Sequence, residues 1–255
     1  MNCVILAAGY ATRLYPLTEN FPKPLLKVGE KTIVDWLIDD VDRCGKIERF
    51  VVVTNAKFAD FFYKWRDDKA AGAEGLVPSK APIDVLNDGS TSHETRIGAV
   101  KDVLFAIEEA NLSGDLLVLA GDNVLDFSLK TFVDYFERVD GDAIMRYYEP
   151  DPKKLRKCGV LELGENDLVL SMVEKPQEPT SNWCVPPFYA YRGLTATKLH
   201  DALKQGCGYD APGSLAAWAC ANEKVYAALM PGKRFDVGDL ESYNKISAEY
   251  RGFNE

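Results

Sequence analysis

Histidine is scarce in this 255-residue chain, which contains only His93 and His200. None of its six cysteines forms a C-x-x-C pair, so the usual zinc-binding spacings are missing and a zinc site is not expected. Several cysteines lie in apolar runs, which predicts reduced thiols packed in the core.

Concentrated basic charge and long apolar runs are also missing. The formal net charge is −9 and the sequence contains no cluster of basic residues, so nucleic acid is not an expected partner. The N-terminal apolar run is too short for a signal peptide or a membrane span, and no basic segment precedes it. We therefore expect no membrane partner and a cytoplasmic location.

The first half of the chain alternates apolar strands with amphipathic helices. This alternation predicts βαβ units around a mixed, mostly parallel sheet, and ligands of such α/β sheets bind beyond the carboxyl ends of the strands. The expected strands are 2–7, 49–55, 82–87 and 115–123, and the expected helices are 32–45, 56–68, 95–110 and a helix that Ser128 caps and that runs to Arg138.

The second half has shorter strands and contains no internal repeat or low-complexity linker. We expect it to extend the same sheet, so that residues 1–255 form one domain with a nucleotide-binding half (about 1–140) and a substrate-binding half (about 141–255). The expected strands are 142–148, 158–164, 168–176 and 185–193, and the expected helices are 194–204, 213–221 and 240–250, the last preceded by the stretches 224–230 and 233–239, with an apolar strand ending at Asp236.

The stretch LAAGYATRLYPLT, residues 6–18, follows the first strand. In Leu6-Ala7-Ala8-Gly9, the small residues after Leu6 would let backbone N–H groups approach a phosphate, and Arg13 could add a bidentate partner. The spacing is neither G-x-G-x-x-G nor G-x-x-x-x-G-K-[ST], so the dinucleotide-binding and P-loop motifs are excluded. An ordinary strand–turn junction is the alternative.

The stretch FPKPLL, residues 21–26, places Lys23 between two prolines. Because prolines restrict the backbone on both sides, this lysine could be aimed at a ligand at a lower entropic cost. A solvated lysine in a proline-rich loop is the alternative.

Together these two stretches resemble the N-terminal signature of the sugar-1-phosphate nucleotidyltransferases, LAxGxGTRLxPLT followed by PKPL. One departure is Ala11, where many members of that family have glycine. The resemblance implies a three-layer α/β/α, Rossmann-like nucleotidyltransferase fold with a mixed, mostly parallel central sheet.

Three later motifs extend the resemblance over nearly the whole chain. VLAGDN resembles the family's metal-binding strand end, which implies Asp122 as a Mg²⁺ ligand beside Gly121. VEKP resembles the sugar-site motif, which implies Glu174 for sugar hydroxyls and Lys175 for the sugar phosphate. FDVGDLESY resembles the segment that supplies a second metal-binding aspartate, here Asp236.

The implied reaction is attack of a sugar-1-phosphate oxygen on the α-phosphorus of a nucleoside triphosphate, with pyrophosphate as the leaving group. The nucleophile is already ionised, so positioning and charge neutralisation suffice and no general base is needed. We expect Arg13 and Lys23 to hold the triphosphate, Lys175 to hold the attacking phosphate, and Asp122 and Asp236 to bind Mg²⁺.

The identity of the base and of the acceptor is less well specified. Asn87 and Gly89 in LNDG could read a base edge, although NDG also suits a tight turn. The region 210–243 looks most like glucose-1-phosphate thymidylyl- and uridylyltransferases, which favours a hexose-1-phosphate with dTTP or UTP. Gly159 and Tyr189 are further candidates for the sugar pocket.

Two other functions remain open. The Asn-Asp pair also resembles phosphocholine cytidylyltransferases, so CTP with phosphocholine or another non-sugar phosphate is the alternative. A non-catalytic regulatory subunit of the same fold is the third hypothesis, which the presence of Arg13, Lys23, Asp122 and Asp236 disfavours. No hexapeptide repeat follows Tyr250, so we expect no C-terminal β-helix, and a monomer or homodimer.

Overall fold

The computed structural model describes residues 1–253, which divide into two compact units. The first unit comprises 1–97, 120–130 and the segment from 231 onward, and the second comprises 98–119 and 131–230. Among the described residues, no helix combines the length and the apolar character needed to cross a membrane.

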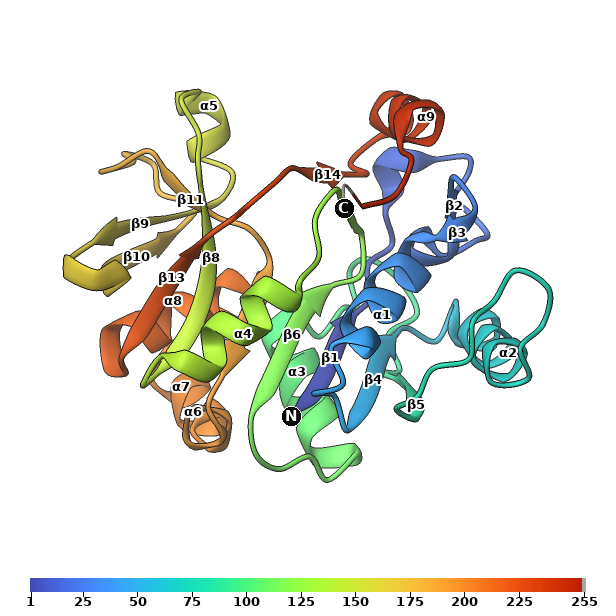
Figure 1. The fold of residues 1–255 in the computed structure, drawn as a ribbon, viewed down its shortest axis with the longest axis horizontal. Coiled ribbons are helices and arrows are strands. Elements are labelled where there is room, and N and C mark those ends of the chain that lie inside the picture. The colour runs from blue at the N-terminus through green and yellow to red at the C-terminus, as the bar shows by residue number, and fades with distance from the viewer. Residues whose placement is uncertain (254–255) are drawn as a thin grey trace. The chain divides into compact units, whose positions relative to one another are not determined.

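The first unit is built on three parallel strands in the order β5-β4-β1 (Figure 1). They span Asn2–Leu6 (β1), Arg49–Thr54 (β4) and Ile83–Asn87 (β5), and the helices between them span Ile33–Arg43 (α1) and Ala59–Ala70 (α2). Val51, Val52 and Val53 are fully buried, as expected of a parallel strand that is covered on both faces. The predicted strands and helices of this region are confirmed.

Two small antiparallel pairs complete the first unit. One joins Lys27–Val28 (β2) to Lys31–Thr32 (β3), and the other joins Asn123–Leu125 (β7) to Arg234–Asp236 (β14). The last helix, Leu240–Glu249 (α9), follows β14, and the Tyr250 hydroxyl after it donates to the Leu125 carbonyl at 2.6 Å. The final segment of the chain is thereby attached to β7.

In the second unit the strand order is β6-β12-β8-β11-β9-β10, with antiparallel pairs throughout and β13 parallel to β8. The mixed α/β class is confirmed. The strands span Leu116–Ala120 (β6), Asp142–Tyr148 (β8), Gly159–Leu163 (β9), Val169–Glu174 (β10), Trp183–Val185 (β11), Phe188–Tyr191 (β12) and Val225–Leu229 (β13).

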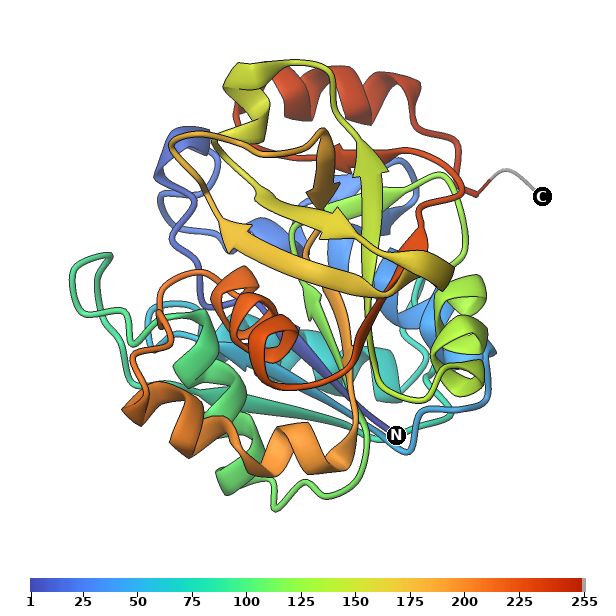
Figure 2. The ribbon, with the colours of Figure 1, turned by 90° about the vertical axis from the view of Figure 1, so that its left-hand side faces the viewer.

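The helices of the second unit follow the predictions except at three points, of which the first is the unpredicted short helix Pro152–Leu155 (α5). They span Ala99–Glu109 (α3), Lys130–Arg138 (α4), Pro152–Leu155 (α5), Gly193–Thr197 (α6), Leu199–Lys204 (α7) and Gly213–Asn222 (α8), and α8 covers β10 (Figure 2). Helix α3 begins at Ala99 instead of Thr95, because Gly98 has a φ of +98° and lies against the Tyr209 carbonyl. The helix expected over 194–204 is divided in two at Lys198, which leaves the helical conformation.

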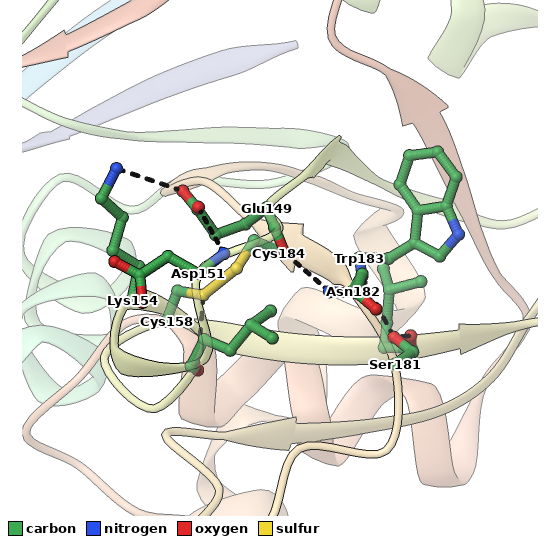
Figure 3. Close-up of a disulfide and its surroundings, with 10 residues drawn as sticks. Glu149, Asp151, Lys154, Cys158, Ser181, Asn182, Trp183 and Cys184 are labelled. Carbon is green, nitrogen blue, oxygen red and sulfur yellow. Dashed lines mark hydrogen bonds and ion pairs between the residues drawn. A yellow bond between two sulfur atoms is a disulfide. The ribbon is translucent and has the colours of Figure 1, made fainter.

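The expectation that the cysteines are reduced is wrong for Cys158 and Cys184, which form a disulfide (Figure 3). The bridge joins the turn before β9 to β11, two segments 26 residues apart in the chain. The spacing of the cysteines in the sequence does not predict this disulfide, because the disulfide depends on the strand pairing that places Cys184 opposite Val160. The other four cysteines remain thiols, as expected.

Candidate active site

Lys23 is the centre of a charged cluster in the first unit. Its Nζ lies 2.8 Å from Asp122 Oδ2 and 3.9 Å from Asp236 Oδ1. The side chain of Lys23 is only 8% exposed, whereas those of Asp122 and Asp236 are 41% and 53% exposed. One buried ammonium therefore contacts two carboxylates that are only partly exposed.

Local backbone structure fixes the position of Lys23. Residues Lys23–Leu25 form a single 3₁₀ turn that follows Pro22 in extended conformation, and Pro24 occupies the second position of the turn. The two prolines restrict φ on both sides, so the lysine reaches the carboxylates from a backbone with few alternatives.

Asp122 stands at the turn between β6 and β7. Gly121 precedes it and donates its N–H to the Leu6 carbonyl at 2.9 Å, and a Cβ on Gly121 would lie 3.1 Å from that oxygen. This glycine thus permits a close approach to the end of β1. Burial raises the pKa of the Asp122 carboxyl, but Lys23 outweighs it and the net pKa is lowered.

The pairing of β14 with β7 brings Asp236 to the same place. The register puts Asp236 opposite Asn123, the residue after Asp122. Asn123 donates from Nδ2 to Asp122 Oδ1 at 2.7 Å and accepts from Arg234 Nη1 at 2.6 Å, and Arg234 Nη1 lies 3.8 Å from Asp236 Oδ2. Sequence reasoning did not include Asn123 and Arg234, although both flank the predicted aspartates.

The small-residue loop after β1 is held by the sheet. Ala7 and Ala8 are buried and Leu6 is partly exposed. Gly9 is exposed, and apart from its two chain neighbours no described residue lies within 4 Å of the position that a Cβ would take there. Asn55, fully buried at the end of β4, donates from Nδ2 to the Ala8 carbonyl at 3.0 Å. Asn55 was also missed, because an asparagine after a strand is first interpreted as a turn residue.

Ala11 and Arg13 end this loop. Ala11 has φ +46° and ψ +42°, a left-handed conformation that disfavours a Cβ and favours glycine. Arg13 lies in the following 3₁₀ turn, Thr12–Leu14, and its side chain is exposed. Hydrogen bonds from Ser242 are the main cause of the lowered pKa of Asp239, and the charge of Arg13 adds to them. Because the Arg13 side chain is exposed, an anionic ligand can reach it.

Asn87 is the last residue of β5 and Gly89 lies just beyond it, and both are exposed. The Asn87 Oδ1 accepts from the Gly89 N–H at 2.9 Å, and Gly89 has a φ of +78°. This geometry is the tight turn that the sequence offered as an alternative to base recognition.

The candidate residues of the second unit gather at the end of β10. Glu174 pairs with Gly159 of β9, and its side chain is 18% exposed. Lys175 follows with a φ of +50°, and its N–H donates to the Cys158 carbonyl at 3.1 Å. Its side chain is 53% exposed and its Nζ lies 4.0 Å from Glu174 Oε1. Tyr189, in contrast, is 3% exposed and stacks on Tyr191.

The donor set of the first unit fits a magnesium ion. Asp122 and Asp236 offer two hard carboxylate oxygens that already share one cationic neighbour, Lys23. Mg²⁺ typically takes one or two protein carboxylates and completes its shell with water and substrate phosphates. Within residues 1–253 no group of three or more histidine, cysteine, aspartate or glutamate side chains could hold a metal.

Comparison with known proteins gives consistent relatives. A UTP–glucose-1-phosphate uridylyltransferase, AglF, of Haloferax volcanii is 26% identical over 98% of this chain and 96% of its own length. A bifunctional GlmU protein of Methanococcus vannielii is 30% identical over 93% of this chain, which spans about half (52%) of that relative. A glucose-1-phosphate thymidylyltransferase of Mycobacterium tuberculosis is 29% identical over 75% of this chain and 61% of its own length.

Solved structures share the fold. A UDP-glucose pyrophosphorylase in complex with UDP-glucose superposes with a TM-score of 0.81 at 19% identity, covering 98% of this chain and 97% of that one. The model of the family described as "Nucleotidyl transferase" matches residues 2–252. Since that match includes the Lys23 cluster as well as Glu174 and Lys175, the chain belongs to the nucleotidyl transferase family.

Proposed function

We propose that this nucleotidyltransferase transfers a nucleotidyl group from UTP or dTTP to a hexose-1-phosphate. A phosphate oxygen of the acceptor forms a bond to the α-phosphorus, and the bond from that phosphorus to the β-phosphate oxygen breaks. Pyrophosphate leaves with the electron pair of the broken bond, and no proton has to move. Two of the relatives are named as glucose-1-phosphate uridylyl- and thymidylyltransferases, which supports this choice of acceptor.

The observation that carries the proposal is the cluster of Lys23 with Asp122 and Asp236 beside the loop after β1. Lys23 and Arg13 would neutralise the triphosphate, and Asp122 and Asp236 would hold Mg²⁺. When bound, the ion would neutralise phosphate charge and orient phosphate oxygens. The backbone N–H groups of Ala8 and Gly9 would approach the phosphates, since neither residue carries a bulky side chain.

In the second unit, Lys175 would bind the acceptor phosphate and Glu174 the sugar hydroxyls. Lys175 is exposed, and its backbone is anchored by the Cys158 carbonyl. Burial raises the pKa of Glu174, and Lys175 lowers it in part. A carboxylate that has lost part of its water shell gains more from hydrogen bonds to sugar hydroxyls.

A grid of substrates tests the proposal. UTP, dTTP, CTP, ATP and GTP would each be combined with glucose-1-phosphate, mannose-1-phosphate, N-acetylglucosamine-1-phosphate and phosphocholine, and pyrophosphate release measured with and without Mg²⁺. We expect turnover with a hexose-1-phosphate and UTP or dTTP. Turnover with CTP and phosphocholine alone would replace this proposal by the cytidylyltransferase alternative, and triphosphate binding without turnover would favour a regulatory subunit.

We also propose a cytoplasmic location, where nucleoside triphosphates are made, and a monomer or homodimer as the assembly. These two proposals rest on the composition of the chain and the proposed substrates, and size-exclusion chromatography with light scattering tests the second.

A further inference from the structure

Glu174 is held between two glycines of the second unit. A Cβ added to Gly213 would lie 2.1 Å from Glu174 Oε2 and 2.8 Å from Glu174 Cδ. A Cβ added to Gly159 would lie 3.0 Å from the same oxygen and 2.4 Å from Met172 Cε. The carboxylate therefore occupies the space that a side chain at position 213 would need, and it would be in tight contact with a side chain at position 159.

The two glycines belong to different elements, which are packed against β10. Gly159 is the first residue of β9 and pairs with Glu174, whereas Gly213 is the first residue of helix α8, which covers β10 (Figure 2). Each of these elements therefore brings a residue without a side chain close to the Glu174 carboxylate.

Helix α8 gives no reason of its own for glycine at position 213. The φ of Gly213 does not lie in the left-handed region, so an alanine fits the backbone. Alanine is also the better helix former by up to about 1 kcal/mol. The close approach of Glu174 explains the glycine.

Glu174 also borders a cavity. Glu174 lines a pocket of about 310 Å³ together with Ser214 and Trp218 of α8 and the loop 205–208. Trp218 Nε1 donates to Gln205 Oε1 at 3.0 Å, which ties that loop to the helix. The volume lies at the lower end of the range of small-molecule sites.

We infer that Gly213 is a positioning residue: its missing side chain leaves the room in which the Glu174 carboxylate takes, at the wall of this pocket, the orientation that binds the acceptor sugar. The identification of the ligand as the acceptor sugar rests on the proposed function, whereas the contact between Gly213 and Glu174 does not depend on it. Gly213 itself would touch no substrate and would act through Glu174.

The test is the variant Gly213→Ala, assayed for the KM of both substrates. Its methyl group would displace the carboxylate, because the 2.1 Å approach cannot be accommodated. We expect the KM for the hexose-1-phosphate to rise roughly tenfold or more, since hydrogen bonds to a charged group are lost, with the KM for the triphosphate within about twofold of wild type.

Two further variants separate positioning from a general effect on the helix. Ala221→Gly weakens the exposed end of α8 without approaching Glu174 and should leave both KM values unchanged. Glu174→Asp shortens the carboxylate by one methylene, so adding Gly213→Ala to it should change the acceptor KM little. Equal effects of Gly213→Ala in both backgrounds would overturn the inference.

A crystal structure of Gly213→Ala supplies a readout that does not depend on activity. A displaced Glu174 carboxylate supports the inference, and a carboxylate in its wild-type position refutes it. If the wild-type enzyme turned over no sugar phosphate, the proposed function would fail, and the crystal structure would still decide whether Gly213 positions Glu174.

Discussion

Replacing Asp122 by asparagine removes one carboxylate from the Lys23 cluster and keeps the shape of the side chain. Lys23 loses a partner at 2.8 Å and retains Asp236 at 3.9 Å. Coulomb attraction falls inversely with distance, so Asp236 supplies roughly seven-tenths of the attraction that the nearer carboxylate gave, before screening by solvent. We therefore expect a moderate loss of stability, about 1–3 kcal/mol, because a buried ammonium is left under-compensated.

Activity should fall much further than stability. The proposed metal site would lose one of its two carboxylates, and removal of one preorganised charge from an active site lowers kcat by about 10²- to 10³-fold. The assays are pyrophosphate release at saturating substrates and urea unfolding followed by circular dichroism. The two measurements together separate a damaged site from a damaged fold.

Asp84→Asn is the matched control. It makes the same chemical change in a partly exposed ion pair with Arg49, which joins β5 to β4 of the same unit. We expect unchanged kcat and a stability change below about 1 kcal/mol. An Asp122→Asn enzyme with near-wild-type kcat would refute the metal role that we assign to Asp122.

Three further predictions concern other residues. Burial raises the pKa of Asp142 to about 6, so the folded protein keeps this proton up to a higher pH than the unfolded chain does. The free energy of unfolding therefore falls as the pH rises from about 4 to 6. Asp142→Asn should remove this pH-dependent loss of stability, which amounts to roughly 3 kcal/mol. Urea unfolding of both proteins at pH 4.5 and pH 8 measures most of it. An equal pH dependence in both proteins would contradict the raised pKa of Asp142. Ala11→Gly relieves a left-handed alanine and should raise the free energy of unfolding by up to about 1 kcal/mol, whereas Ala11→Val should lower it, as thermal melting would show. Lys175→Ala should mainly raise the KM for the hexose-1-phosphate, and a rise confined to the triphosphate KM would place Lys175 on the wrong substrate.

Most of the regular elements could be predicted because their apolar periodicity is strong. The buried strand RFVVVT and the amphipathic helix that begins at Ile33 coincide with β4 and α1. The short elements were missed, since β2, β3, β11 and α5 have at most four residues and carry too little pattern.

The chemical types of the site residues could also be predicted, but their partners could not. Lys23 and Asp122 are 99 positions apart, and only the folded chain brings them within 2.8 Å. The roles of Asn55, Asn123 and Arg234 depend on such contacts as well. The close contact between Gly213 and Glu174 could not be predicted either, because a glycine gives no indication in a single sequence of which side chain needs the space beside it.

The first unit is assembled from three stretches of chain, and this has a consequence for biosynthesis. Lys23 is made early, whereas Asp236 lies in the segment from 231 onward, after the 100 residues 131–230 of the second unit have been made. At about 5–20 residues per second, a ribosome needs roughly 5–20 s to make that stretch. During this time the nascent first unit lacks β14 as a partner for β7, and Val124 and Leu125, fully or almost fully buried in the finished protein, lack their final covering. A chaperone that binds exposed apolar strands would have its longest opportunity in that interval, and the two carboxylates of the site can meet only when it ends.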